Sequence, residues 1–401
     1  MSKLEELIQQ YCPDGVEYVR FVDYANVLYG CPFDAAQFTN DSSYIPLIRI
    51  RDVLSGKAGT YYKGEYSHDY IIKKGDILVG MDGNFNLGIW DDIDGLLCQR
   101  VCKLYTKDET RLLNGFIRHY MKPVFRQIEE STPGGSVKHL SAKAINSIHI
   151  PLPPLPVQEE IVRVLDAFTE LQAELQAELQ KRKQQYNYYR DNLLTNFTTE
   201  QNVKEYTLGE LGTFTRGNGL QKKDFTKEGI GCIHYGQIYT RFGAFADKTL
   251  TYVNRELASH LLQVEKGNLV IACTSENVED ICKSVAWLGE ENICTGGHAC
   301  VFRHNQNPKY ISYFFQTEYF FNQKKKYTYG TKVKDIKPDS IAKIKIPLPS
   351  LKEQERIVSI LDNLYTLTTD LTQGLPAEIE KRRQQYEYYR DKLLAFKRKG
   401  A

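Results

Sequence analysis

The sequence predicts an α+β protein made of two copies of one unit, each with a mixed α/β domain followed by a long helix. The first observation is an internal repeat. Residues 148–166 and 344–362 share 12 of 19 positions, and residues 181–194 and 381–394 share 11 of 14. The second is an apolar stripe of helical period in both copies of the repeat. The third is a set of β-branched, partly alternating segments before each helix. The two helices are expected to form an antiparallel coiled coil with a pseudo-two-fold repeat.

The repeated blocks predict the helices. Apolar residues recur every three or four positions, so they lie on one helix face. They are Ile161, Leu165, Phe168, Leu171, Leu175 and Leu179 in the first copy, and Ile357, Leu361, Leu364, Leu367, Leu371, Leu375 and Ile379 in the second. A helix over 157–195 would be roughly 58 Å long. Each stripe either lies on its own domain or pairs with the other helix, and the near identity of the two helices favours pairing.

The second copy has four more residues between its two blocks than the first copy has. These extra residues include Gly374 and Pro376. These residues predict a kink or a short break in the second helix. The chain is accordingly divided into a first domain (1–150), a first helical segment (151–198), a second domain (199–346) and a second helical segment (347–401).

The two domains carry the strand-like segments. Expected strands cover 44–53, 69–80, 95–105, 266–273 and 298–304, and expected helices cover 114–125 and 309–322. Weak repeat similarity continues into this region. KKGDILVG at 73–80 resembles EKGNLVIA at 265–272, and GGSVKHL at 134–140 aligns with GTKVKDI at 330–336, which keeps Lys138 in step with Lys334.

Composition excludes several classes of protein. The formal net charge is +2, from 52 Lys and Arg against 50 Asp and Glu, so a uniformly basic coat is excluded. No stretch of 18 apolar residues is present, so no membrane span is expected. The first ten residues lack the apolar core of a signal peptide. Nine dispersed cysteines without a C-x-x-C pair indicate reduced thiols and a cytoplasmic location.

The chain lacks the sequence patterns of common catalytic sites. There is no phosphate-binding loop, Rossmann glycine pattern, zinc helix or nucleophile elbow. His298, Cys98 and Cys273 are expected to be structural, and Asp76 to be a turn residue. We therefore predict no catalytic residue and no metal site in this chain.

Local basic and polar segments are the remaining candidates, for contact with nucleic acid. Arg49 and Arg51 would share one face of a strand, and arginine makes bidentate contacts with guanine. Lysines interleaved with tyrosines around 324–334 suit phosphate contacts, although a solvated loop has the same composition. The full set is Arg49, Arg51, Asn84, Asn86, Lys138, Arg216, Asn218, Ser275, Asn277, Lys324, Lys325, Lys326, Lys332 and Lys334.

Over essentially its whole length the chain resembles the specificity subunits of type I restriction–modification enzymes. The resemblance is carried by the doubled I-P-L-P-x-L…Q-E…I-V…L-D block and the doubled K-R-[KR]-Q-Q-Y-x-Y-Y-R-D-x-L-L block, each preceded by a variable domain. The opening ELIQQYCPDGVEYVRF, the GDILVGMDGNFN segment and the IACTSENVED segment are also similar to those of the family.

The resemblance implies a non-catalytic subunit whose two variable domains are target recognition domains, each reading half of a bipartite DNA sequence. It implies two partner methyltransferase subunits that carry S-adenosylmethionine and methylate adenine at N6. It also implies restriction subunits that use ATP and Mg²⁺, so no cofactor is expected on this chain. The helices would dock these partners and set the spacer between half-sites. The residues expected at helix–helix or partner contacts are Ile161, Leu165, Phe168, Leu175, Leu179, Ile357, Leu361, Leu364 and Leu371.

Two other functions fit parts of the sequence. A coiled-coil adaptor for protein partners is compatible with the near-neutral charge and the many tyrosines. Steep loss of DNA binding with salt would argue against it. A stand-alone methyltransferase or nuclease lacks its motifs here, and methylation by the purified chain with S-adenosylmethionine alone would be its test.

Overall fold

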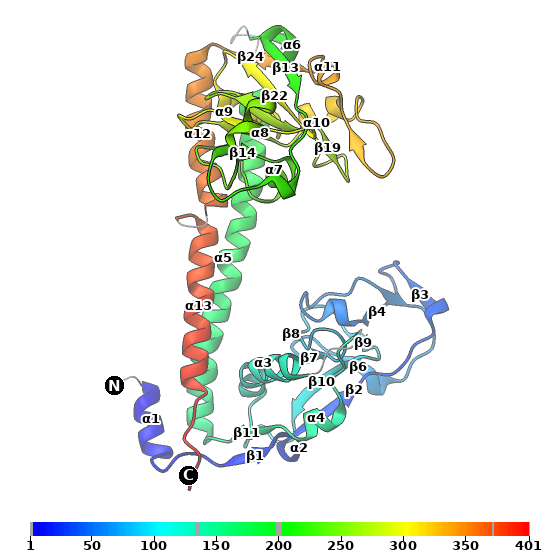
Figure 1. Ribbon diagram of the computed structural model, residues 1–401. Helices are drawn as coiled ribbons and strands as arrows, with labels where there is room; N and C mark the ends of the chain where they lie inside the picture. Colours follow the sequence, from blue (N-terminus) through cyan, green and yellow to red (C-terminus); the bar gives the residue numbers. More distant parts are fainter. Residues whose placement is uncertain (1–2, 133–136, 198–202, 371–372, 401) are drawn as a thin grey trace. The chain divides into compact units, whose positions relative to one another are not determined.

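A computed structural model describes residues 3–132, 137–197, 203–370 and 373–400. The chain forms two compact units: Met1–Glu174 with Glu380–Ala401, and Leu175–Ile379. Each unit therefore contains one whole domain together with parts of both repeat helices (Figure 1). This division into two units differs from the four segments expected from the sequence, because the helical segments contribute to both units.

The first unit holds two sheets of four and five strands, with orders β2-β10-β7-β8 and β3-β5-β4-β9-β6, and a β1-β11 pair. Its core gathers around α3, whose Phe116 and Phe125 are fully buried. Its elements are α1 (Lys3–Tyr11), β1 (Tyr18–Arg20), α2 (Phe21–Tyr24), β2 (Ala25–Tyr29), η1 (Ala35–Gln37), β3 (Phe38–Thr39), β4 (Ile45–Ile48), η2 (Ile50–Asp52), β5 (Tyr61–Tyr62), η3 (His68–Tyr70), β6 (Ile71–Ile72), β7 (Ile77–Gly80), β8 (Leu87–Ile89), β9 (Gly95–Leu97), β10 (Val101–Thr106), α3 (Asn114–Ser131), α4 (Ala142–Asn146), β11 (His149–Pro151) and the first part of α5 (Leu155–Thr195).

The second unit repeats this plan, with sheets β13-β22-β18-β20-β15 and β16-β14-β21-β17 and the pairs β12-β24 and β19-β23. Its elements are β12 (Lys204–Thr207), α6 (Leu208–Leu211), β13 (Gly212–Arg216), η5 (Lys222–Asp224), β14 (Ile230–Ile233), α7 (Tyr235–Thr240), β15 (Phe245–Ala246), β16 (Thr251–Val253), α8 (Arg255–His260), β17 (Leu262–Val264), β18 (Leu269–Ala272), β19 (Thr274–Ser275), β20 (Ser284–Trp287), β21 (Ile293–Thr295), β22 (Ala299–His304), α9 (Pro308–Phe314), α10 (Glu318–Lys324), β23 (Lys334–Asp335), α11 (Pro338–Ile341), β24 (Lys345–Leu348) and α12 (Leu351–Thr369). Helix α13 (Leu375–Leu393) contributes to both units.

One turn shows how closely the two domains correspond. Gly75 and Gly267 both have a φ near +90°, which favours glycine, and each donates its N–H to the carbonyl of a buried tryptophan, Trp90 or Trp287, at 2.8 and 2.7 Å. The repeat seen weakly in the KKGDILVG and EKGNLVIA segments is thus a repeat of structure.

The apolar stripes are buried against two partners. In the first unit, Ile161 and Leu165 of α5 pack with Phe116 of α3 and with Tyr386 of α13, which runs antiparallel to α5 (Figure 1). In the second unit, Ile357 and Leu361 of α12 pack with α9 and with Tyr186 of α5. Each stripe therefore covers its own domain as well as the other helix, so the two alternatives considered above are both realised.

Other stripe residues are less buried. Leu179 is buried, whereas Phe168, Leu175 and Leu364 are half-buried. Phe168 stacks on Tyr389 with ring centroids 5.4 Å apart. Leu371 lies outside the described residues. The predicted break in the second helix is present: α12 ends at Thr369, and α13 begins at Leu375.

A glutamine in each repeat block joins the helix to its domain. The side chains of Gln158 and Gln354 are fully buried. Each accepts a hydrogen bond from the backbone just before α3 or α9, at Leu113 (3.0 Å) or Asn307 (3.1 Å). Since buried polar groups need such partners, this residue type is required at both places.

A polar contact to an aspartate lies eight residues after each glutamine along its helix. In the first unit, His119 of α3 contacts Asp166 of α5 (2.6 Å) and the Tyr386 hydroxyl (3.1 Å). In the second unit, the Tyr313 hydroxyl donates to Asp362 (2.6 Å), which also binds Lys309 (2.6 Å). His119 and Tyr313 occupy equivalent positions and hold their domains to the helices.

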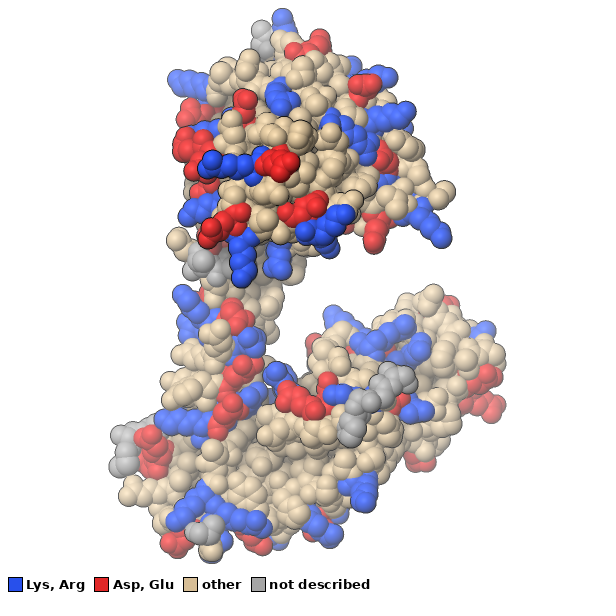
Figure 2. All heavy atoms as spheres, viewed as in Figure 1, with Lys and Arg blue, Asp and Glu red and all other residues tan. Residues whose placement is uncertain are grey.

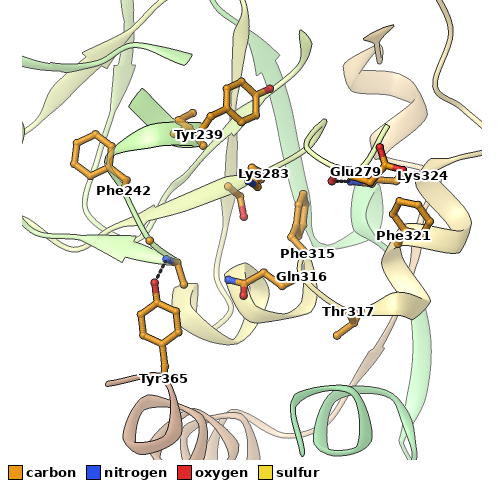
Figure 3. Close-up of a pocket in the computed structure, with 14 residues that line it drawn as sticks. Tyr239, Phe242, Glu279, Lys283, Phe315, Gln316, Thr317, Phe321, Lys324 and Tyr365 are labelled. Atoms are coloured by element: carbon orange, nitrogen blue, oxygen red, sulfur yellow. Dashed lines mark hydrogen bonds between the residues drawn. The ribbon is translucent and has the colours of Figure 1, made fainter. Parts of the chain in front are cut away.

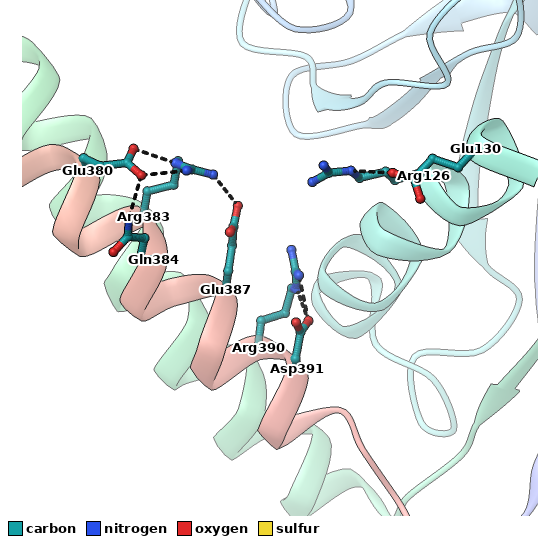
Figure 4. A network of polar contacts seen from close by, with 8 residues as sticks. All are labelled: Arg126, Glu130, Glu380, Arg383, Gln384, Glu387, Arg390 and Asp391. Carbon is teal, nitrogen blue, oxygen red and sulfur yellow. Dashed lines mark hydrogen bonds and ion pairs between the residues drawn. The ribbon is translucent and has the colours of Figure 1, made fainter.

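The ends of the chain meet in the first unit. Val16 donates its N–H to the Lys397 carbonyl (2.9 Å), and Lys399 donates to Val16 (2.9 Å). Along the rest of α13 in this unit, Glu380, Arg383 and Glu387 form a ladder of ion pairs (Figure 4). This face of α13 is solvated, as expected for charges spaced three and four apart.

Four of the predicted elements were wrong in part. The strands expected over 69–80 and 95–105 are each two strands of different sheets, β6 and β7 in the first case and β9 and β10 in the second, separated by turns. The strand expected over 44–53 ends at Ile48, because the Asp52 carboxylate accepts a hydrogen bond from the Arg49 N–H (2.9 Å) and starts the 3₁₀ turn η2. The helix expected over 309–322 is split into α9 and α10, because the Thr317 side chain caps the start of α10. Gly134 of the repeat alignment lies outside the described residues. No described helix is long and apolar enough to cross a membrane.

Candidate nucleic-acid interface

Three segments of the first unit meet where β7 ends. The Met81 N–H donates to the Arg100 carbonyl (2.8 Å), and the Leu140 N–H donates to the Met81 carbonyl (2.7 Å). These backbone bonds place Asp82 between Arg100 and His139. The Asp82 carboxylate pairs with the Arg100 guanidinium (2.9 Å) and with His139 Nδ1 (2.6 Å). The result is a polar cluster at one edge of the sheet.

Beside this cluster is an arginine-rich pocket of about 450 Å³. Arg49, Arg51 and Arg100 line it together with Phe33, Phe38, Ile50, Cys98 and Gln99, and no carboxylate is among the lining residues. Arg49 lies over the Phe38 ring, 5.8 Å from its centroid. Arg51 donates to the Thr60 hydroxyl (2.5 Å). Two of these arginines are also ion-paired, Arg51 with Asp52 (3.7 Å) and Arg100 with Asp82 (2.9 Å). A lining with three arginines favours an anionic or acceptor-rich ligand, such as a phosphate or the edge of a guanine.

The second unit builds the same site with different side chains. The Cys273 N–H donates to the His298 carbonyl (2.8 Å), and the Ile336 N–H donates to the Cys273 carbonyl (3.1 Å). His234 follows a parallel strand as Arg49 does, and its N–H donates to the Gln237 side chain (3.0 Å) just as that of Arg49 donates to Asp52. The equivalent positions are Arg49 and His234, Asp82 and Thr274, Arg100 and His298, and His139 and Asp335. We call these the four recognition positions.

In the second unit these positions form an aromatic and polar cluster. The Tyr235 ring lies between the rings of His234 and His298 and is tilted against both, with centroids 4.5 and 4.7 Å apart. The exposed His298 ring bonds to the Thr274 hydroxyl (3.1 Å). Arg216 binds Asp335 with two hydrogen bonds of 2.7 and 3.0 Å. Although burial opposes it, this pairing holds the pKa of Asp335 below its usual range.

The predicted residues of the first unit fall into two groups. Arg49 and Arg51 are exposed and line the pocket, although they lie on a 3₁₀ turn and not on one face of a strand. Asn84 is exposed and Asn86 is half-buried, in the loop between β7 and β8. Lys138 is adjacent to His139, but its ammonium donates to the Glu129 carbonyl (2.5 Å) at the end of α3.

Most of the predicted residues of the second unit lie near the cluster. Ser275 pairs with Lys334 across β19 and β23, next to Thr274 and Asp335. Asn218 is exposed beyond β13. The amide of Asn277 is used within its own turn, where it bonds to Asp280. Lys325, Lys326 and Lys332 are exposed, and Lys334 donates to the Gly330 carbonyl (2.8 Å).

Lys324 is not available to DNA, and the prediction for it was wrong. Its side chain is 4% exposed and donates to the Glu279 carbonyl (2.9 Å) and the Ile281 carbonyl (2.5 Å). Burial lowers the pKa of this ammonium. Lys324 lies beside a cavity of about 320 Å³ bounded by Tyr239, Phe315 and Tyr365 (Figure 3), whose inner surface includes the buried Ser284.

Sequence reasoning missed Asp82, Arg100, His139, His234, Thr274 and Asp335, and it expected His298 to be a structural residue within a strand. His298 is in fact exposed, in a turn just before β22. The available signal was the weak repeat: Arg100 and His298 each directly precede a β-strand at equivalent places, β10 and β22. The hydrogen bonds that make these two residues equivalent join segments far apart in the chain. The sequence pattern therefore did not identify Arg100 and His298 as site residues.

Charge is mixed over both units. On the face shown in Figure 2, Lys and Arg are interspersed with Asp and Glu. Among the described residues, no group of three or more His, Cys, Asp or Glu is placed to hold a metal ion. Any attraction for nucleic acid must therefore come from local clusters such as the arginine pocket.

Comparison with known proteins defines the class to which this architecture belongs. The model of the type I restriction modification DNA specificity domain matches twice, over residues 13–182 and 200–381. The chain belongs to this family. It is 30% identical over 345 residues to the EcoR124I/EcoR124II specificity subunit of Escherichia coli, covering 84% of each chain. It is 28% identical over 415 residues to a putative type I specificity subunit, S.HindORF215P, of Haemophilus influenzae, covering 98% of each.

Solved structures agree on the fold. One chain, from a study of complex assembly and conformational transition of the type I restriction–modification system, matches with a TM-score of 0.58 at 17% identity, covering 95% of this chain and 98% of that one. The S subunit of M. genitalium matches with a TM-score of 0.50 at 15% identity, covering 94% and 95%. The two-unit plan with long helices is therefore the fold of type I specificity subunits.

Proposed function

We propose that this chain is the non-catalytic subunit that gives a type I restriction–modification complex its DNA sequence specificity. Each domain reads one half of a bipartite target, and the paired helices set the length of the unread spacer. The observation that carries the proposal is the equivalence of the four recognition positions in the two units. The same backbone scaffold presents Arg49, Asp82, Arg100 and His139 in one unit, and His234, Thr274, His298 and Asp335 in the other. A duplicated reader of two different half-sites requires this combination of a constant scaffold and changed side chains.

The partners in this proposal are double-stranded DNA, two methyltransferase subunits and restriction subunits. The methyltransferase subunits supply S-adenosylmethionine and methylate adenine at N6, and the restriction subunits supply ATP- and Mg²⁺-dependent cleavage. Paired tyrosines on the repeat helices support two equivalent docking surfaces. Tyr188 and Tyr388 are 66% and 62% exposed, and each packs edge-to-face on the next tyrosine. Exposed aromatic side chains of this kind are enriched at protein interfaces.

The docking surface has its own test. Replacing Tyr188 and Tyr388 with Ala should reduce the methyltransferase subunits recovered per specificity subunit on co-purification, from two towards none. A single replacement should leave one. Tyr66→Ala is the control, because Tyr66 is 38% exposed and belongs to the loop between β5 and η3 and not to a repeat helix. Full recovery with the double variant would contradict this docking surface.

The function is tested by a methylome. The chain is co-expressed with the modification subunit encoded beside it, in a host without adenine methylation, and N6-methyladenine is mapped across the genome. We expect one bipartite motif with a fixed spacer. Methylation by the purified chain with S-adenosylmethionine alone would contradict a non-catalytic role. A stable complex that neither methylates nor binds DNA would favour a protein adaptor.

A further inference from the structure

We infer that Arg100 reads a guanine in the half-site bound by the first domain. This inference rests on the proposed function and deepens it, because it assigns one base to one side chain. Arg100 was not among the residues that sequence patterns indicated. Its case rests on the backbone that carries it, on the carboxylate that orients it, and on the residue that replaces it in the second unit.

The backbone at Arg100 is constrained. Its φ is +73°, a conformation that side chains other than glycine rarely adopt. It lies in a turn closed by the Val101 N–H and the Cys98 carbonyl (3.3 Å), and its own carbonyl accepts from Met81 (2.8 Å). Strained backbone of this kind persists where the surrounding structure imposes it, and it is concentrated at functional sites. Here the strained residue is one of those that line the arginine-rich pocket.

The guanidinium is held in place but not consumed. Asp82 binds Nη1 of Arg100 (2.9 Å), and its other oxygen binds His139 (2.6 Å). Asp82 is 20% exposed, whereas Arg100 is 55% exposed. The Nε and Nη2 atoms of Arg100 have no partner among the described residues. A planar fork with one edge fixed and one edge free matches the O6 and N7 acceptors of guanine, and adenine would present a donor to the same edge.

Comparison of the two units separates base reading from phosphate binding. Lys138 and Lys334 keep a cation at equivalent places in both units, and each ammonium also donates to a backbone carbonyl, of Glu129 or Gly330. Arg100 instead becomes His298, and Asp82 becomes Thr274, with a bond between those two side chains retained (3.1 Å). Phosphates are the same at both half-sites, so a phosphate contact has no reason to change. A position that changes while its scaffold stays constant is one that follows the base sequence.

The experiment compares methylomes of complexes that contain wild-type chain, Arg100→Ala or His298→Ala. For Arg100→Ala, we expect discrimination to fall about 10-fold or more at one G·C pair of the first half-site, with the second half-site unchanged. His298→Ala should alter the second half-site alone. Arg126→Ala is the matched control, because Arg126 is an exposed arginine of the same unit that pairs with Glu130 on its own helix (Figure 4). It should leave the motif intact.

Arg100→Gly separates recognition from folding. Glycine relieves the positive φ, so the melting temperature of the complex should stay equal or rise while the guanine preference is lost as in Arg100→Ala. An unchanged motif with Arg100→Gly would overturn the inference. Equal weakening at all sequences would also overturn it, since that is the behaviour of a phosphate contact. If the wild-type complex methylates no bipartite motif, the proposed function itself fails, which is a distinct result.

Discussion

A single buried side chain, His119, connects three helices of the first unit. Burial lowers its pKa to about 4, although the hydrogen bond that the imidazole makes to the Asp166 carboxylate acts in the opposite direction. The unfolded chain binds this proton near pH 6.5, so stability that is present above that pH is lost as the pH falls from 6.5 towards 4. The loss at pH 5 should be about 2 kcal/mol in the first unit. Urea unfolding monitored by hydrogen exchange at a series of pH values between 7.5 and 5 measures this loss of unfolding free energy.

The second unit supplies the variant for this test. His119→Tyr introduces the residue type that the second unit has at the equivalent position, Tyr313. The Tyr313 hydroxyl donates to Asp362. Tyrosine does not titrate in this range, so the pH dependence of the first unit should become shallower. His68→Ala is the control, because His68 is an exposed residue of the same unit and its removal should leave the slope unchanged. A slope that survives in His119→Tyr would assign the acid sensitivity to other groups.

At the scale of the element, α5 carries a tandem QAEL tetrapeptide over residues 172–179 and is helical throughout it. Inserting one more QAEL would lengthen the helix by about 6 Å, near two base-pair rises, and rotate it by roughly 40°. The apolar stripe would stay almost in line. We expect the methylome motif to gain spacer length with both half-sites unchanged. The comparison variant has four residues inserted in the 373–374 segment between α12 and α13, where the helix is already interrupted. A changed half-site in either variant would refute the prediction.

At the scale of the whole molecule, each domain core includes residues from a distant part of the chain. Tyr386 and Leu394 of the C-terminal segment belong to the core of the first unit, and Tyr186 and Leu194 of α5 belong to that of the second. Tyr386→Ala should therefore destabilise the first unit by about 3 kcal/mol, and Tyr186→Ala the second unit by a similar amount. Hydrogen exchange resolved by peptide distinguishes the two. Each variant serves as the control for the other, and equal loss of protection in both units from either variant would contradict this assignment.

The sequence by itself determined the repeat, the long helices and the break near Gly374 and Pro376, because these depend on local periodicity and on residue types with strong backbone preferences. The class of protein came from the resemblance of the doubled blocks to a known family. The sequence also indicated Arg49, Arg51 and the polar turns. Only the tertiary structure decided that Lys324 is buried and that Asp82, Arg100 and His139 form one cluster. These outcomes depend on hydrogen bonds such as that from Met81 to Arg100, which join segments far apart in the chain. Side-chain burial and convergence are set by such long-range contacts, and a pattern of neighbouring residues does not encode them.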